Sequence, residues 1–215
     1  MHIPIAQPSL GNEESDAVLT VLASGMIAQG PVTAAFEEEF AAYCGIPHAV
    51  AVSNGTTALH AALLATGVGP GDEVVVPAFT FFATASSVSM CGARPVFADV
   101  DAATATIDPA DVLAKVTPKT KAVIGVHLYG QPCDAGAIRE ICDDKGLVFI
   151  EDAAQAHGAT YRGQKTGSLG DLACFSFYAT KNLATGEGGM VTTASDEYDA
   201  RLRRIINHGQ SEKYL

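Results

Sequence analysis

Short apolar runs alternate with longer stretches of helical periodicity through most of the chain. The apolar runs predict strands near residues 49–53, 73–76, 95–98, 121–126, 147–150, 173–177 and 189–193. The periodic stretches predict helices near residues 12–23, 33–43, 56–66, 80–91, 134–145 and 196–207. Because such alternation usually produces a sheet of mainly parallel strands with helices on its faces, the pattern predicts an α/β fold.

Polar and turn-forming residues interrupt this pattern without dividing the chain. The acids Glu37–Glu39 are expected on the solvated face of the second helix. The segments Gly69–Gly71 and Gly130–Pro132 are typical of loops and not of linkers. With 215 residues, of which 48% are hydrophobic, the chain is expected to form one domain, 1–215, in which a helical segment over about 1–45 precedes the α/β core.

Charge and composition exclude several classes of function. The chain has 13 basic and 24 acidic residues, a net charge of −11, whereas a nucleic-acid surface needs clustered lysine and arginine. No apolar run approaches the roughly 18 residues of a membrane span, and the amino terminus lacks the pattern of a secretory signal. We therefore expect a cytoplasmic protein without nucleic-acid or membrane partners.

The cysteines indicate a reducing environment. They stand at positions 44, 91, 133, 142 and 174 and form no CxxC pair. Because their number is odd, any disulfide scheme would leave one unpaired, and we expect reduced thiols in the core. No metal site is expected.

Candidate chemistry begins with Lys181, which lies between an apolar run and a glycine-rich turn. A lysine in such a place either extends to water or has its pKa lowered enough to act as a nucleophile. Further upstream, the apolar run 147–150 ends in Glu151 and Asp152. The lysine and a strand-end acid suggest pyridoxal phosphate, which needs a Schiff-base amine and an acidic partner for its ring nitrogen. A solvated lysine and a helix-capping acid are the alternatives.

A third element strengthens the cofactor interpretation. The segment Ala49–Leu63 has the pattern of a strand, a tight turn and a helix. Gly55 permits close approach of the backbone, and the helix after it directs unpaired N–H groups and a positive dipole end at an anion. An ordinary capped connection would give the same local pattern, but the coincidence of three such elements favours a phosphate-bearing cofactor.

Four motifs occur in order along the chain: Ser53–Ala58, Pro77–Thr84, Glu151–Gly158 and Ser176–Gly189. Together they resemble the successive signatures of the DegT/DnrJ/EryC1/StrS sugar aminotransferases. The segments Ile3–Pro8 and Gln29–Glu37 are similar too, so the resemblance runs from end to end. It implies the large domain of the fold-type I pyridoxal phosphate (PLP) enzymes, an α/β domain with a seven-stranded mixed sheet that has one antiparallel strand.

The resemblance also implies catalytic roles. Lys181 would form the Schiff base with the cofactor and move the proton of the reaction, and Asp152 would keep the pyridine nitrogen protonated. Phe81 is similar to the aromatic residue that stacks on the ring in this family. Phe79 and Phe82 are close enough in sequence that the pattern alone does not choose among the three.

Further cofactor contacts follow from the same motifs. Gly55, Thr56 and Thr57 would form the phosphate cup, and Ser176 resembles a hydroxyl that completes it. Gln155 corresponds to a position often occupied by histidine or glutamine beside the phenolic oxygen of the ring. An amide there can donate a hydrogen bond without titrating.

The implied activity is transfer of an amino group from an amino acid, by family analogy L-glutamate, to a nucleotide-linked keto-sugar, which gives an amino sugar. The implied assembly is a homodimer with shared active sites. Family members usually continue into a smaller carboxyl-terminal domain, which is therefore expected beyond residue 215 and absent from this chain.

Two other functions stay open. A PLP- or pyridoxamine-dependent sugar dehydratase of the same family would resemble this sequence with histidine in place of Lys181. A non-catalytic nucleotide-sugar sensor would need neither Lys181 nor Asp152. The sugar and its aminated carbon are also open. Thr185–Gly189 is more similar to members that aminate C4, whereas Ser176–Tyr178 and Asn182–Leu183 are more similar to members that aminate C3.

Overall fold

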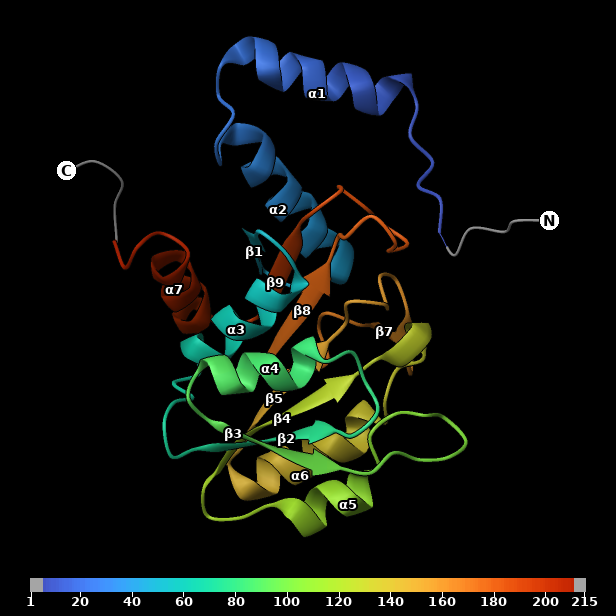
Figure 1. Cartoon of the computed structure of the whole chain (residues 1–215), viewed down its shortest axis with the longest axis vertical. Helices are drawn as coiled ribbons and strands as arrows, with labels where there is room; N and C mark the ends of the chain where they lie inside the picture. Colours follow the sequence, from blue (N-terminus) through green and yellow to red (C-terminus); the bar gives the residue numbers. More distant parts are fainter. Residues whose placement is uncertain (1–5, 211–215) are drawn as a thin grey trace.

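The computed structural model describes residues 6–210, so residues 1–5 and 211–215, with the first part of the Ile3–Pro8 motif, lie outside the described residues. A seven-stranded sheet in the order β1-β9-β8-β5-β4-β2-β3 forms its centre (Figure 1). The strands are β1 His48–Val52, β2 Glu73–Pro77, β3 Arg94–Ala98, β4 Thr120–Val126, β5 Val148–Asp152, β8 Leu172–Ser176 and β9 Gly189–Thr193. Strand β9 runs antiparallel to both β1 and β8, and the other described pairs of this sheet are parallel, which confirms the predicted mixed sheet.

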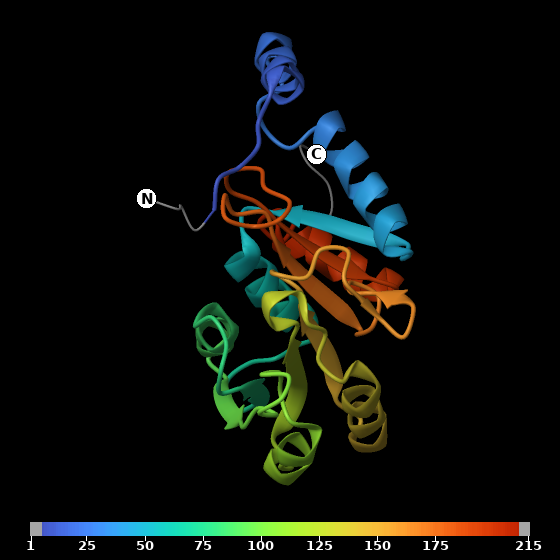
Figure 2. The same cartoon turned by 90° about the vertical axis from the view of Figure 1, so that its right-hand side faces the viewer.

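The central strands are buried because helices cover both faces of the sheet (Figures 1 and 2). All residues of β2, β8 and β9 are buried, as expected for apolar strands that pack on both sides. The helices are α1 Asn12–Ser24, α2 Pro31–Cys44, α3 Gly55–Ala65, α4 Ala83–Met90, α5 Pro109–Lys115, α6 Ala135–Lys145 and α7 Asp196–Ile205. The hydrophobic core on one face of the sheet includes residues of α3, α4 and α7. Two further core clusters, on the other face, include residues of α2, α5 and α6.

The short elements are the ones that periodicity does not predict. Helix α5 has only seven residues, and its signals are a cap and a proline, since Asp108 accepts a hydrogen bond from Ala110 N and Pro109 opens the helix. A single 3₁₀ turn, η1, spans Leu128–Gly130. The two-residue strands β6 Thr160–Tyr161 and β7 Gln164–Lys165 form a small hairpin.

The expectation of a fully solvated acidic face on α2 is wrong for Glu37. This side chain is buried, accepts a hydrogen bond from Ala51 N over 2.7 Å and pairs with Arg203 over 2.6 Å. Arg203 in turn donates to Ala49 O. Glu37 therefore joins α2, β1 and α7, while Glu38 and Glu39 are exposed as expected.

Helix α1 stands apart from the sheet (Figures 1 and 2). It buries no residue, and Val18, Leu19 and Leu22 are each about three-fifths exposed, at 60%, 61% and 59%. A cavity of about 1240 Å³ lies between the α1–α2 connection, α3 and α7. The five cysteines are buried and free, as predicted. No helix within residues 6–210 is both long and apolar enough to cross a membrane.

Candidate active site

A cavity of about 500 Å³ opens where the carboxyl ends of β4, β5 and β8 meet the amino terminus of α3. Ligands of α/β proteins commonly bind at this edge of the sheet. The cavity is lined by Asn54, Gly55, Thr56, Leu59, Thr80, Phe81, Ala83, Val126, Asp152, Ala154, Gln155, Ser176, Tyr178, Thr180, Lys181 and Glu187. Seven of the eight residues predicted to catalyse or to bind the cofactor are among them.

Asp152 is the last residue of β5, and its carboxylate is buried. Burial raises the pKa of the Asp152 carboxyl, and a hydrogen bond from Thr84 opposes this shift. Thr84 Oγ1 donates to Asp152 Oδ2 over 2.8 Å and also lies 2.9 Å from the hydroxyl of Thr80. Thr84 is not among the predicted site residues, although its spacing from Thr80 would place both on one side of a helical turn.

Lys181 reaches the same cavity from the loop after β8. Its main-chain N–H donates to Tyr178 O over 2.8 Å, so the backbone of the loop is turned back at this residue. Partial burial lowers the pKa of the Lys181 amine, and the charge of Asp152 opposes the shift. A lowered pKa raises the share of neutral amine at a given pH, and only the neutral amine is a nucleophile.

The amino terminus of α3 lies against the end of β8. A Cβ atom on Gly55 would be 2.7 Å from the Cβ atom of Ser176, so only glycine allows this approach. The first N–H groups of a helix have no partner within it, and those of Gly55 and Thr56 belong to residues that line the cavity. Backbone N–H groups, the Thr56 side chain and the Ser176 hydroxyl therefore form a surface suited to an anion.

Thr57 is the one predicted residue that lies outside this cavity. Its main-chain N–H donates to Asn54 Oδ1 over 2.9 Å, and its hydroxyl contacts the backbone N–H and carbonyl of Asn54. The side chain of Thr57 thus caps α3, and it faces the larger cavity beside α1.

The aromatic residues before α4 differ in their positions. Phe81 lines the cavity, whereas Phe79 and Phe82 do not. The rings of Phe81 and Phe82 contact each other at a centroid distance of 4.3 Å, and Phe82 is 70% exposed. Of the three candidates, Phe81 has the place from which a ring could stack on a ligand.

The glycine-rich segment after Lys181 passes directly beneath the start of α3. A Cβ atom on Gly189 would overlap the carbonyl group of Asn54, and one on Gly188 would be 2.5 Å from the hydroxyl of Thr185. Phe177 N donates to Gly188 O over 2.8 Å, which closes the loop. These glycines therefore serve close backbone packing under the cavity.

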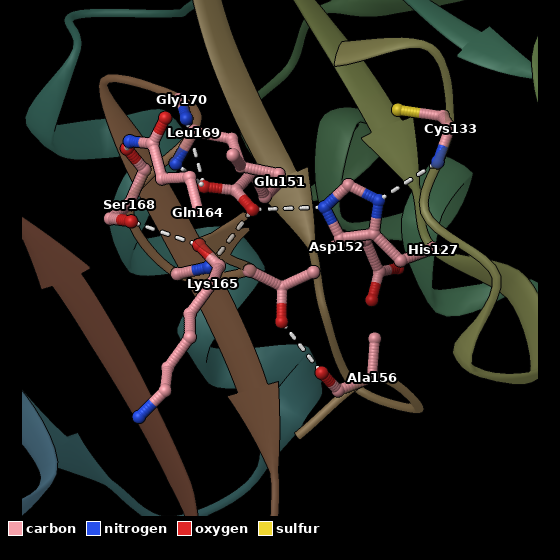
Figure 3. Close-up of polar contacts among 12 residues, drawn as sticks. His127, Cys133, Glu151, Asp152, Ala156, Gln164, Lys165, Ser168, Leu169 and Gly170 are labelled. Carbon is pink, nitrogen blue, oxygen red and sulfur yellow. Dashed lines mark hydrogen bonds and ion pairs between the residues drawn. The ribbon is translucent and has the colours of Figure 1, made fainter. Parts of the chain in front are cut away.

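A buried carboxylate, Glu151, lies next to Asp152 in the chain and fixes the surroundings of β5 (Figure 3). It accepts hydrogen bonds from the main-chain N–H groups of Gly167, Leu169 and Gly170 over 2.7 to 2.9 Å. Its fourth partner is Nε2 of His127, 2.9 Å away. Because Cys133 N donates to Nδ1 of His127, the ring hydrogen is on Nε2 and is donated to Glu151.

His157 and Asn182 support the loop of Lys181 from the side. His157 Nδ1 lies 2.7 Å from Asn182 Oδ1, and the Asn182 amide donates to His157 O. The imidazole packs against Phe175 and Phe177. His157 is not among the residues that line the cavity. Within residues 6–210, no group of three or more His, Cys, Asp or Glu side chains could hold a metal ion.

Comparison with known proteins agrees with this arrangement. The DegT/DnrJ/EryC1/StrS aminotransferase family matches residues 8–215. The chain is 51% identical over 209 residues to GDP-perosamine synthase of Caulobacter vibrioides, a match that covers 97% of this chain and 56% of that protein. It is 46% identical to dTDP-3-amino-3,4,6-trideoxy-alpha-D-glucose transaminase of Streptomyces venezuelae, with 100% and 57% covered.

The similarity extends to solved structures. A structure from Streptococcus pneumoniae described as a PLP form of a sugar aminotransferase superposes with a TM-score of 0.94 at 34% identity, covering 98% of this chain and 59% of that one. The chain described here belongs to the DegT/DnrJ/EryC1/StrS aminotransferase family. It spans between 54% and 57% of the length of two curated relatives, in Bacillus subtilis and Streptomyces venezuelae.

Proposed function

We propose that this chain carries the cofactor site of a PLP-dependent aminotransferase that converts a nucleotide-linked keto-sugar into an amino sugar. The observation that carries the proposal is that Lys181 and Asp152, 29 positions apart in the sequence, line one cavity together with the amino terminus of α3. The names of the Caulobacter and Streptomyces relatives support the sugar substrate. An amino acid, L-glutamate by family analogy, is proposed as the amino donor.

The donor set of the cavity fits PLP. The ligand has an aldehyde, a basic ring nitrogen and a phosphate. Against these groups the cavity presents an amine of lowered pKa in Lys181, a buried carboxylate in Asp152 and the start of a helix at Gly55. The close contact of Gly55 with Ser176 keeps that helix end free of side-chain bulk. The three groups belong to separate segments of the chain, and the fold brings them to one cavity.

The chain's own residues would hold and orient the cofactor. Lys181 Nζ would bind it covalently and then, once displaced by a substrate amine, take up and return a proton beside the reacting carbon. Asp152 would hold a proton on the ring nitrogen, and Thr84 fixes the direction of that carboxylate. Bound PLP supplies an electron sink for the bonding electrons of that carbon. Phe81, on the cavity wall, would exclude water from one face of the ring.

The proposal includes three finer points that follow from the family. Both active sites of a homodimer would lie at the subunit interface. A smaller carboxyl-terminal domain would accompany this cofactor-binding domain, as the family resemblance implies. The cytoplasmic location expected from the sequence stays a prediction.

The lysine favours transamination over the other two candidates. A dehydratase of this family would resemble the chain with histidine at the position of Lys181. A sensor would need neither a nucleophilic amine nor an acid that holds a proton on a cofactor ring. Lys181 and Asp152 are both present.

The first test is a map of the covalent bond. Full-length protein loaded with PLP is expected to absorb at about 400 to 430 nm, and borohydride reduction followed by peptide mapping should place the pyridoxyl group on Lys181. Lys181→Ala should lose this band and all turnover while it keeps part of its noncovalent cofactor affinity. Lys121→Ala, which changes an exposed lysine of β4, is the matched control. An adduct on Lys165 or another lysine would disprove the assignment.

The second test concerns the substrate. The full-length protein should be assayed with nucleotide-linked sugars that carry the keto group at C3 or at C4, with L-glutamate as donor. Turnover of one of these classes is the expected result. A protein that binds PLP at Lys181 but aminates none of them would keep the cofactor assignment and lose the sugar assignment.

A further inference from the structure

The amide of Gln155 is held in one orientation. Gln155 lines the cavity beside Asp152 and Lys181. Its side-chain oxygen Oε1 accepts a hydrogen bond from the main-chain N–H of Tyr129 over 2.7 Å. Only the carbonyl end of an amide can accept from an N–H group, so this bond decides which end is which. The amide nitrogen Nε2 makes no hydrogen bond to residues 6–210 and is left as a donor for a ligand.

The N–H group that holds Gln155 comes from a strained residue. Tyr129 has φ 55° and ψ 24°, in the left-handed region, inside the turn η1. For a bulky residue other than glycine or asparagine this conformation is unfavourable by about 1 kcal/mol or more. Tyr129 gains no burial in return, since its side chain is 77% exposed. The strained conformation sets the direction of the backbone at this residue. In this direction the main-chain N–H of Tyr129 points to Oε1 of Gln155.

The surrounding contacts hold the turn in place. His127, the residue before η1, donates its main-chain N–H to Asp152 O over 3.0 Å, and its ring bonds to Glu151 (Figure 3). On the other side, Gln131 N donates to Leu128 O over 2.9 Å. The turn is thus tied to β5 just before the segment that carries Gln155. The buried pair of His127 and Glu151 therefore helps to fix the turn that carries the Tyr129 N–H.

We propose that Tyr129 is a positioning residue whose left-handed backbone conformation makes Gln155 a dedicated hydrogen-bond donor toward the bound cofactor. The inference rests on the proposed PLP site and adds to it a control element outside the four family motifs. Gln155 without the Tyr129 N–H could turn its amide, and its oxygen would then face an anionic ligand atom and repel it. The conformation of the main chain, and not the tyrosine ring, carries the effect.

The test compares two substitutions that remove the same ring. Asparagine tolerates the left-handed region, whereas a β-branched residue opposes it. Tyr129→Asn should therefore keep the orientation of Gln155, and Tyr129→Val should lose it. Gln155→Met deletes the amide at similar volume and so gives the effect of losing the hydrogen-bond donor completely. The readout is the pH at which the visible band of the PLP-loaded, full-length protein is half lost. Removal of a donor to a ligand oxyanion makes the conjugated nitrogen cation hold its proton to higher pH.

The expected result is an upward shift of about one pH unit in Gln155→Met, the effect of one hydrogen bond to a charged group. Tyr129→Val should shift the midpoint in the same direction, and Tyr129→Asn should keep it within about 0.2 units of the parent by the same measure. In the double variant Tyr129→Val/Gln155→Met the shift should equal that of Gln155→Met alone, because both changes act through one amide.

Three results would overturn the inference. Equal shifts in Tyr129→Asn and Tyr129→Val would assign the effect to the ring. Shifts that add in the double variant would show that Tyr129 does not act through Gln155. Parent-like midpoints in both Gln155→Met and Tyr129→Val would show that the amide is not a donor to the chromophore. A parent protein without a Lys181-dependent band would instead refute the PLP proposal itself, and borohydride mapping distinguishes that case.

Discussion

Asp152 and Lys181 each occupy a place that disfavours their charge. Burial raises the pKa of the Asp152 carboxyl and lowers that of the Lys181 amine, and the two groups partly offset each other. A protein gains no stability from such placement, because a buried ion is costly even when it is paired. Perturbed groups that share one cavity are typical of active sites, where the stability cost is accepted for reactivity.

Asp152→Asn tests whether the buried carboxylate is needed for activity. An amide cannot hold the positive charge of a protonated ring nitrogen, so the transamination half-reaction should fall by several orders of magnitude. The near-equal volume leaves little room for a packing explanation. Single-turnover measurements on the PLP-loaded protein give the rate, and a near-normal value would refute the role of Asp152.

The same variant carries a prediction about stability and pH. Because burial raises the pKa of Asp152, the folded protein binds this proton more tightly than the unfolded chain does. Well below its ordinary pKa of 3.8, the carboxyl therefore takes no free energy of unfolding from the protein. As the pH rises from there through the raised pKa of the folded state, the carboxyl progressively lowers that free energy. Cofactor-free Asp152→Asn should gain stability over the parent between about pH 4 and pH 7. Urea unfolding at both pH values measures the difference, and a gap that shrinks with pH contradicts the argument.

Gly55 tests the helix end that is assigned to the phosphate. Gly55→Ala places a Cβ atom 2.7 Å from that of Ser176, so the start of α3 must move away from β8 at a cost of about 1 to 3 kcal/mol. Gly69→Ala is the matched control, because its added atom meets nothing within 4 Å. Urea unfolding and the Kd for PLP should both worsen in Gly55→Ala and change little in Gly69→Ala. Unchanged PLP affinity in Gly55→Ala would place the phosphate elsewhere.

Two loops depend on one carboxylate at the centre of the sheet. Glu151 accepts three main-chain N–H groups from residues 167–170 and a fourth bond from His127. In Glu151→Gln the amide nitrogen would face these donors, and the variant should lose about 3 kcal/mol of unfolding free energy. Glu140→Gln, on the exposed face of α6, should change it by less than about 0.5 kcal/mol. A loss below 1 kcal/mol in Glu151→Gln would mean that these bonds contribute little.

The sequence predicts the longer elements and the polar ends of strands, but not the partners that meet through the fold. The strand 147–150 and the acid after it are visible as an apolar run with a polar end, and β5 with Asp152 has that form. Glu37 is the opposite case, because its partner Arg203 lies 166 positions away and no local pattern reveals its burial. Tyr129 could not be predicted for a different reason, because nothing about a tyrosine in the sequence indicates a left-handed backbone conformation.

Helix α1 and its neighbouring cavity form an exposed apolar surface. The side chains of Leu19, Leu22, Met26 and Ile27 are 58% to 74% exposed, which is unusual for a closed domain. The cavity beside them includes Ile205 and Ile206, close to the last described residue.

The rim of the candidate active site indicates where a second subunit would pack. Phe82 is 70% exposed next to Phe81 of the cavity wall, and Tyr129 is 77% exposed at the same edge of the sheet. Symmetric dimers are the commonest soluble oligomers, and aromatic residues are enriched in their interfaces. A subunit that covers these rings would also close the cavity to water. We therefore expect Phe82 to lie in the dimer interface.

Phe82→Glu in the full-length protein should raise the Kd for dimerisation at least about tenfold, because a charge would be buried against the partner. Leu113→Glu changes a 50% exposed side chain on α5, which packs on the opposite face of the sheet from α4, and should leave the dimer intact. Light scattering over a dilution series measures the equilibrium, and the visible band reports bound PLP in the same samples. Loss of the band should accompany dissociation, since a monomer would expose the cofactor edge. A monomeric parent protein with full activity would refute the shared site.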